Sequence, residues 1–190
     1  MLLRSAVLLL LVPFAVALPT GPNSYRPRIV DWAGPMFVPA FPAGQPPPQA
    51  VILRYQRWSS ASGRVENVAD RACGVVFEHQ VQMQLSLPGG RLLDVSSRTG
   101  SEARLLAAYD GLEDFDGTSG LALSSIAGDT TYLVLDDPAD IAHFAGGGGG
   151  VSLWVLATGQ AVFTGPSTLR QEVEVRAGAR LTVEYVPGAP

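Results

Sequence analysis

Apolar and polar residues alternate with a period of two over much of the chain, starting near residue 51. The clearest stretch is 77–87, where one parity is polar and the other is apolar apart from one histidine. The second parity consists of Phe77, His79, Val81, Met83, Leu85 and Leu87. A strand with one face on a core and one face in water shows this alternation. Pro88-Gly89-Gly90 then predicts a turn, and residues 91–96 predict its hairpin partner.

Other segments repeat the pattern. Further strands are predicted at 51–58, 105–109, 121–126, 131–135 and 151–163, and at 169–176 and 180–185 around a turn at Ala177-Gly178-Ala179. A short helix is predicted at 137–144, because Asp137 can cap it and Pro138 suits its first turn. Many short strands without βαβ spacing predict an all-β protein, an antiparallel β-sandwich of jelly-roll-like type with one short helix.

The first residues have the layout of a secretory signal peptide. Arg4 precedes an apolar run at 6–16, and Ala15 and Ala17 are the small residues that a signal peptidase reads. The run is shorter than the roughly 20 apolar residues that span a bilayer. We therefore expect a signal peptide at 1–17 that is cleaved after Ala17. The mature protein is then secreted, either periplasmic or extracellular, and has no transmembrane anchor.

A proline-rich N-terminal arm or linker is predicted at 18–50, before a β-sandwich domain at 51–187. Nine of the 15 prolines lie between residues 19 and 48. Each proline fixes φ and removes a backbone donor, so the arm is not expected to form a hydrogen-bonded ladder. Its apolar residues between 29 and 41 predict partial packing on the domain, or an apolar tether.

Charge and cysteine content narrow the possible partners. The chain has 13 basic and 17 acidic residues, a net charge of −4, and no basic stripe, which argues against nucleic acid as a partner. The lone Cys73 cannot form an internal disulfide and is expected to be a small buried hydrophobe rather than a thiol that pairs between chains. The expected partners are an extracellular polysaccharide or an envelope protein. The charged parity of 169–176 is expected to form an outer face that limits edge pairing.

One dense acidic segment is the candidate metal site. Asp110, Asp114 and Asp116 are the candidate ligands, and calcium is the candidate ion, because calcium prefers closely spaced carboxylate oxygens. The pattern Asp-x-Asp-Gly at 114–117 is half of a calcium loop, but position twelve is Ser125 instead of glutamate. The alternative is a polar turn in which aspartate and glycine serve local backbone geometry. No other cofactor is expected.

The sequence favours a protein that is not an enzyme. Carboxylates within one turn rarely face each other across a cleft as in glycosidases, and Gly117-Thr118-Ser119-Gly120 is not a nucleophile elbow. His79 is expected to be a hydrogen-bonded core residue, and His143 to lie near the end of the short helix. Trp58 shares its parity with polar residues and is the candidate residue for stacking on a sugar, whereas Trp154 is expected to be buried.

Three segments, in order, resemble the bacterial choice-of-anchor E domain. They are 51–58 with Gly63-Arg64-Val65, then 109–120, then 140–144 with the glycines from Gly146 and the closing Val183-Glu184-Tyr185. The resemblance covers 51–186 and implies a secreted surface or matrix protein, and no catalytic residues are carried over from it. The family's C-terminal anchor signal is missing from this sequence, and its mixed loop is an unbroken glycine run at 146–150.

The function predicted from all of these features is that of a secreted, non-enzymatic β-sandwich protein of the bacterial cell envelope or extracellular matrix, with a structural or adhesive role. The alternative is a carbohydrate-binding module, with or without calcium.

Overall fold

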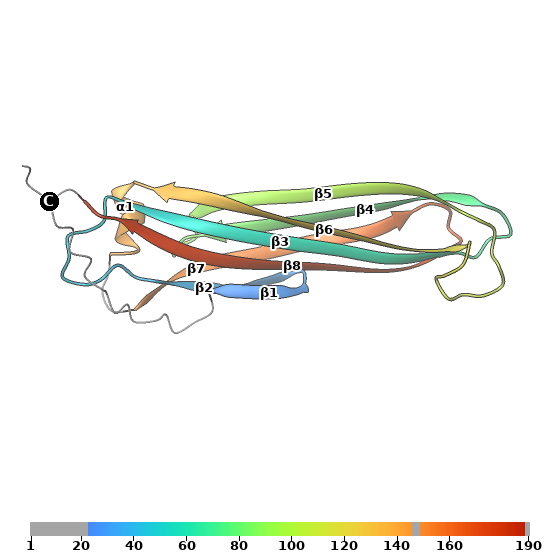
Figure 1. Cartoon of the computed structure of the whole chain (residues 1–190), viewed down its shortest axis with the longest axis horizontal. Helices are drawn as coiled ribbons and strands as arrows, with labels where there is room; N and C mark the ends of the chain where they lie inside the picture. Colours follow the sequence, from blue (N-terminus) through green and yellow to red (C-terminus); the bar gives the residue numbers. More distant parts are fainter. Residues whose placement is uncertain (1–22, 146–148, 189–190) are drawn as a thin grey trace, which may run out of the picture.

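Two four-stranded antiparallel sheets pack face to face and form a sandwich, with one short helix at one end (Figure 1). The computed structural model describes residues 23–145 and 149–188, so the predicted signal peptide at 1–17 lies outside the described residues. Six of the strands contain 14 to 18 residues, which makes the body long and narrow. The predicted all-β sandwich is confirmed.

The strand order is that of a jelly roll. The first sheet contains, in spatial order, β1 (Ser24–Ile29), β8 (Leu169–Val186), β3 (Ala50–Asn67) and β6 (Gly120–Leu135). The second sheet contains β2 (Trp32–Pro39), β7 (Gly150–Thr164), β4 (Cys73–Ser86) and β5 (Leu92–Leu106). The pairs β4–β5, β3–β6, β2–β7 and β1–β8 are nested along the chain and alternate between the sheets, as expected for a jelly roll.

The core lies between the two sheets and uses the parity predicted for residues 77–87. The five apolar residues of that parity are buried, namely Phe77, Val81, Met83, Leu85 and Leu87. Phe77 packs on Phe163 of β7, with ring centroids 4.7 Å apart. Gly63 of β3 lies against both rings and leaves no space for a side chain of its own. A glycine is therefore required at this point of the core, where two aromatic rings pack against the facing strand.

Part of the proline-rich segment belongs to the sandwich, in contrast to the expected arm that forms no ladder. β1 pairs with β8, and β2 pairs with β7. The Pro35 carbonyl of β2 accepts a hydrogen bond from the Tyr25 hydroxyl at 2.7 Å and so points away from β7. Because the nitrogen and carbonyl of one residue point to the same side of a strand, the missing donor of Pro35 costs no ladder bond on this edge strand. The sandwich thus begins near Ser24 instead of residue 51.

Several predicted breaks lie within continuous strands. The expected turn at 177–179 is inside β8, the expected gap at 127–130 is inside β6, and the predicted strands 91–96 and 105–109 belong to one strand, β5. Gly178 pairs with Trp58 of β3, whose indole fills the space that a side chain at Gly178 would occupy. This glycine therefore serves close packing, and not a turn.

The short helix α1 (Pro138–Ala142) follows β6, as predicted. Asp137 caps it by accepting a hydrogen bond from the backbone N–H of Ala139 at 2.8 Å. Ile141 and the following Phe144 are buried and close this end of the core. Among the described residues α1 is the only helix, and it is much too short to cross a membrane.

Candidate functional site

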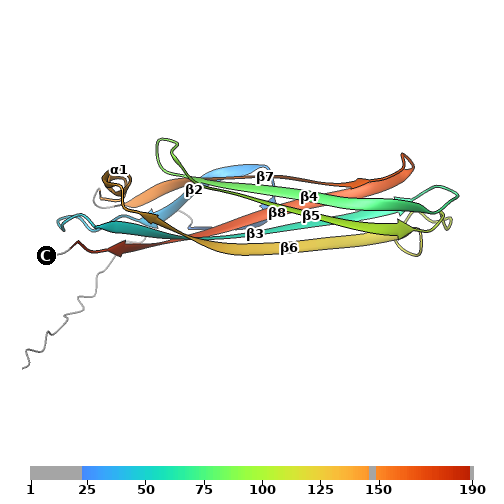
Figure 2. The same cartoon turned by 90° about the horizontal axis from the view of Figure 1, so that it is seen from above.

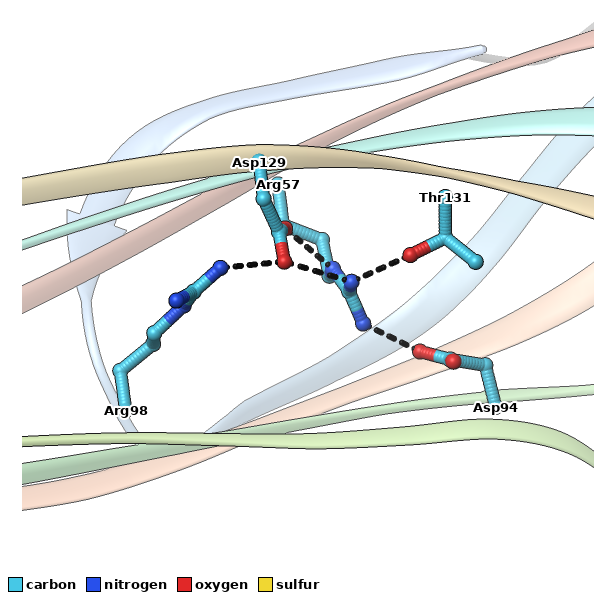
Figure 3. A network of polar contacts seen from close by, with 5 residues as sticks. All are labelled: Arg57, Asp94, Arg98, Asp129 and Thr131. Atoms are coloured by element: carbon cyan, nitrogen blue, oxygen red, sulfur yellow. Dashed lines mark hydrogen bonds and ion pairs between the residues drawn. The ribbon is translucent and has the colours of Figure 1, made fainter.

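A network of charged side chains joins the two sheets beside the edge strands β5 and β6 (Figure 3). Arg57 of β3 lies on the inward parity and is 7% exposed. Its guanidinium donates two hydrogen bonds to the Asp129 carboxylate of β6, at 2.8 and 2.9 Å, and one to Asp94 of β5. One carboxylate comes from each sheet, so the buried arginine clamps the two edge strands together.

Two further side chains complete the network. The Thr131 hydroxyl accepts a hydrogen bond from Arg57 at 2.6 Å, and Arg98 of β5 donates to Asp129. Beside them is a small, partly open pocket of about 10 Å³, which is room for about one water molecule. Burial raises the pKa of the neighbouring Tyr55 well above its usual range, so this phenol stays neutral and cannot act as a base. The geometry is that of an internal brace.

The structure places Asp110, Asp114 and Asp116 in the loop between β5 and β6, where all three are exposed. Each accepts a hydrogen bond from a nearby backbone N–H, at 3.0, 3.0 and 2.8 Å, from Leu112, Asp116 and Gly117 respectively. These bonds match the polar-turn alternative. Within residues 23–145 and 149–188, no three acidic, histidine or cysteine side chains are grouped closely enough to hold a metal ion.

Two buried polar residues at the end of β3 hold this loop. Glu66 and Asn67 are both fully buried. The Glu66 carboxylate accepts a hydrogen bond from the backbone N–H of Phe115 at 2.8 Å. The Asn67 side chain makes three hydrogen bonds, from its amide to the carbonyls of Arg71 and Ala107 and from the N–H of Ala69 to its oxygen. Neither residue was singled out from the sequence, because a polar residue at a strand end is an ordinary feature.

Asn67→Ala is expected to lower the free energy of unfolding by about 1–3 kcal/mol, because it removes three hydrogen bonds from a buried side chain to the loop backbone. Gln56→Ala on the same strand is the control, since the half-buried Gln56 makes no side-chain hydrogen bond within the described residues. Urea unfolding measures both changes, and hydrogen exchange of residues 107–119 reports whether the loop loosens. Equal losses in the two variants would contradict the anchoring role.

The two histidines lie in different elements. His79 points inward from β4, and its ring centroid is 5.9 Å from that of Phe77. It is half-buried, as expected for a core position, but its buried Nδ1 has no hydrogen-bond partner among the described residues, contrary to the prediction. His143 is exposed and caps the C-terminal end of α1, where it was predicted.

Acid is expected to destabilise the sandwich through His79. Burial lowers the pKa of His79 below 6.5, so the unfolded chain takes up this proton at a higher pH than the folded chain. The stability that neutral His79 contributes is complete above pH 6.5 and is lost as the pH falls through the lowered pKa. Urea midpoints at about pH 8 and about pH 5 measure the loss. His79→Gln should show a smaller loss, and an equal loss would contradict this assignment.

The aromatic residues differ from their predictions. Trp58, the candidate for stacking, is half-buried because its indole lies over Gly178. Trp154, expected to be buried, is 49% exposed on the outer face of β7. The glycine beside Trp58 leaves room for the indole to lie on the sheet, and Trp154 is exposed because it lies on the outward parity of β7, between the buried Leu153 and Val155.

Three strongly exposed large apolar side chains lie on the outer face of β6. Ile126 is 83% exposed, Tyr132 62% and Val134 61%, and we call these three residues the β6 apolar row. Sequence reasoning missed it, although Tyr132 and Val134 lie on the parity opposite to the inward Leu133. It also missed the network around Arg57, for which the signal was an arginine on the apolar parity of β3.

Comparison of the chain with family models, with curated proteins and with solved structures finds no match.

Proposed function

We propose that this chain is an exported, non-enzymatic β-sandwich protein of the bacterial cell envelope or extracellular matrix, with a structural or adhesive role. The signal-peptide pattern at 1–17 and the resemblance to the choice-of-anchor E domain support export and a surface location. The sandwich fold agrees with this role but does not select it, because jelly rolls serve many unrelated functions.

The observation that carries the adhesive role is the β6 apolar row. Single apolar residues on a surface are ordinary, whereas several large ones along one strand form a patch suited to contact. Val134 also pairs with the half-buried Ile52 of β3, which widens the apolar surface. Arg57 and Asp129, near this edge, are engaged in internal bonds, whereas the exposed Arg54 lies beside Tyr132.

Substitution of the β6 apolar row by serine is expected to remove most of the protein's retention on bacterial envelope fractions and on extracted matrix polymer. The matched control replaces the three exposed apolar residues of the other long edge strand by serine, namely Leu92, Val95 and Leu105. Both variants should stay folded, because all six side chains are exposed. Equal retention of the parent and both variants would refute adhesion through this surface.

Export has its own test. Expression in a bacterial host followed by cell fractionation and N-terminal sequencing should give a mature protein that begins at Leu18. Ala17→Asp should block this cleavage, because the peptidase needs a small side chain at that position. An intact precursor in the cytoplasm of cells that carry the parent sequence would refute the predicted location.

The alternative function, a carbohydrate-binding module, is favoured by the exposed indole of Trp154. An exposed aromatic face can stack on a sugar ring. Retention on immobilised polysaccharides should then fall in Trp154→Ala, and Trp58→Ala tests the residue selected from the sequence. A calcium titration with and without chelator tests Asp110, Asp114 and Asp116. Heat of binding and a raised melting midpoint would support a calcium site, and the absence of both would rule it out.

A further inference from the structure

Three of the four edge strands carry features that prevent pairing with another chain. β1 is short and has a register shift beside Arg26-Pro27-Arg28, and β2 contains Pro35 and Pro39. β5 carries four charged residues, namely Asp94, Arg98, Glu102 and Arg104. Charges, prolines and bulges of this kind protect sheet edges from adding a further strand.

The open ends of the inner strands are also protected. β2 covers β7 only as far as Ala157. In the uncovered part of β7, the N–H groups of Gly159 and Phe163 donate to the side chains of Asp31 and Gln171, at 3.2 and 2.9 Å. Beyond the reach of β1, β8 carries charged residues on its outer face, namely Arg170, Glu172 and Glu174.

β6 carries the weakest protection of the four edge strands, a single inward charge at Asp129. It runs for 16 residues without a proline, lysine or arginine, and it pairs with β3 without any register shift. Its single charged residue, Asp129, points inward and is bound by Arg57 and Arg98. Among the described residues β6 pairs with β3 alone, and it lies at the margin of the sandwich (Figure 2). A long, regular and nearly uncharged edge is a template for strand addition.

We propose that β6 pairs antiparallel with β6 of a second copy of this chain, across a two-fold axis at Thr130. The β1-β8-β3-β6 sheets of the two copies then form one continuous sheet through the dimer. The inference goes beyond the proposed function, because it concerns the chain's own assembly. The β6 apolar row would still lie on the outer face of the continuous sheet, so the dimer is compatible with the proposed adhesion. The overlap covers residues 125–135 of each strand.

Self-complementary side chains select this register and this partner. Pairing about Thr130 places Ile126 opposite Val134, Tyr132 opposite Gly128, and the two Thr130 residues opposite each other. Apolar pairs, threonine pairs and an aromatic ring over a glycine are all favourable across strands. The first sheet already contains one such aromatic–glycine contact, Trp58 over Gly178.

The neighbouring registers fit less well. An axis at Asp129 would place two carboxylates directly opposite each other, which is unfavourable. An axis at Gly128 would place Ile126 opposite Thr130 and Val134 opposite Ala122, so the apolar rows of the two copies would not contact each other. Of these three registers, the axis at Thr130 is the one that brings Ile126 and Val134 of the two copies together.

Sedimentation of the purified full chain over a range of concentrations tests the dimer. Thr130→Lys should weaken dimerisation about tenfold or more, because two ammonium groups would face each other at the axis. Thr99→Lys is the matched control, because Thr99 is an exposed threonine on the other long edge strand. A protein that stays monomeric at all concentrations, or a dimer that Thr130→Lys leaves intact, overturns the proposal.

Cysteine cross-linking tests the register. In a Cys73→Ser background, Thr130→Cys should form an interchain disulfide, because directly opposed residues have Cα atoms about 4.5–5.5 Å apart. Ser124→Cys should form none, because the two copies of residue 124 lie far apart when the axis is at Thr130. Cross-linking through residue 124 and not residue 130 overturns the register, and a dimer broken by Thr99→Lys alone would assign the interface to β5.

Discussion

Arg57→Met is expected to lower the free energy of unfolding by about 3–5 kcal/mol, the largest loss from a single polar substitution in this chain. The change removes the cation that binds Asp94 and Asp129, whose side chains are only 16% and 29% exposed. Arg98 reaches Asp129 but is bound to no other member of the network, so Asp94 is left without an ionic partner. Urea unfolding monitored by tryptophan fluorescence measures the loss.

Arg54→Met is the matched control for Arg57. Arg54 lies three residues earlier on β3, is exposed and makes no ion pair among the described residues, so its loss should stay below about 0.5 kcal/mol. A triple variant that also replaces Asp94 and Asp129 by leucine should regain part of the stability, because no partly buried charge is left without its partner. Equal losses in the two single variants would show that the network does not brace the sheets.

Phe77→Ala is expected to cost about 3–5 kcal/mol of unfolding free energy, because it leaves a cavity in the core between the sheets. The ring of Phe77 packs on Phe163 and on the bare backbone of Gly63, which cannot fill the space. Thermal and urea unfolding measure the loss, and a smaller slope in urea would show that the native state has loosened.

Phe37→Ala is the control for Phe77, since Phe37 lies half-buried on the outer parity of β2. Its loss should be about 1 kcal/mol, because less apolar surface is exposed and no interior cavity forms. A Phe77→Ala variant as stable as Phe37→Ala would mean that the sheets re-pack around the cavity.

The local sequence pattern was sufficient to predict the buried face of β4 and the start of α1. The parity of residues 77–87 predicted which face of β4 is buried, and Asp137 with Pro138 predicted the start of α1. Both signals are local, because a pleated strand alternates its side chains and a helix start needs a capping side chain nearby. The acidic loop could be interpreted in two ways, and the structure shows the local hydrogen bonds of the turn alternative.

The sequence by itself determined the fold class, the short helix and the inward faces of the strands, since those follow from periods of a few residues. Only the tertiary structure decided which strands lie at the edges, that Gly178 makes room for an indole instead of a turn, and that Arg57 meets a carboxylate from each sheet. Arg57 lies 37 residues from Asp94 and 72 from Asp129 along the chain. No local pattern specifies such pairings, because they depend on the register between strands that the jelly roll brings together from distant parts of the sequence.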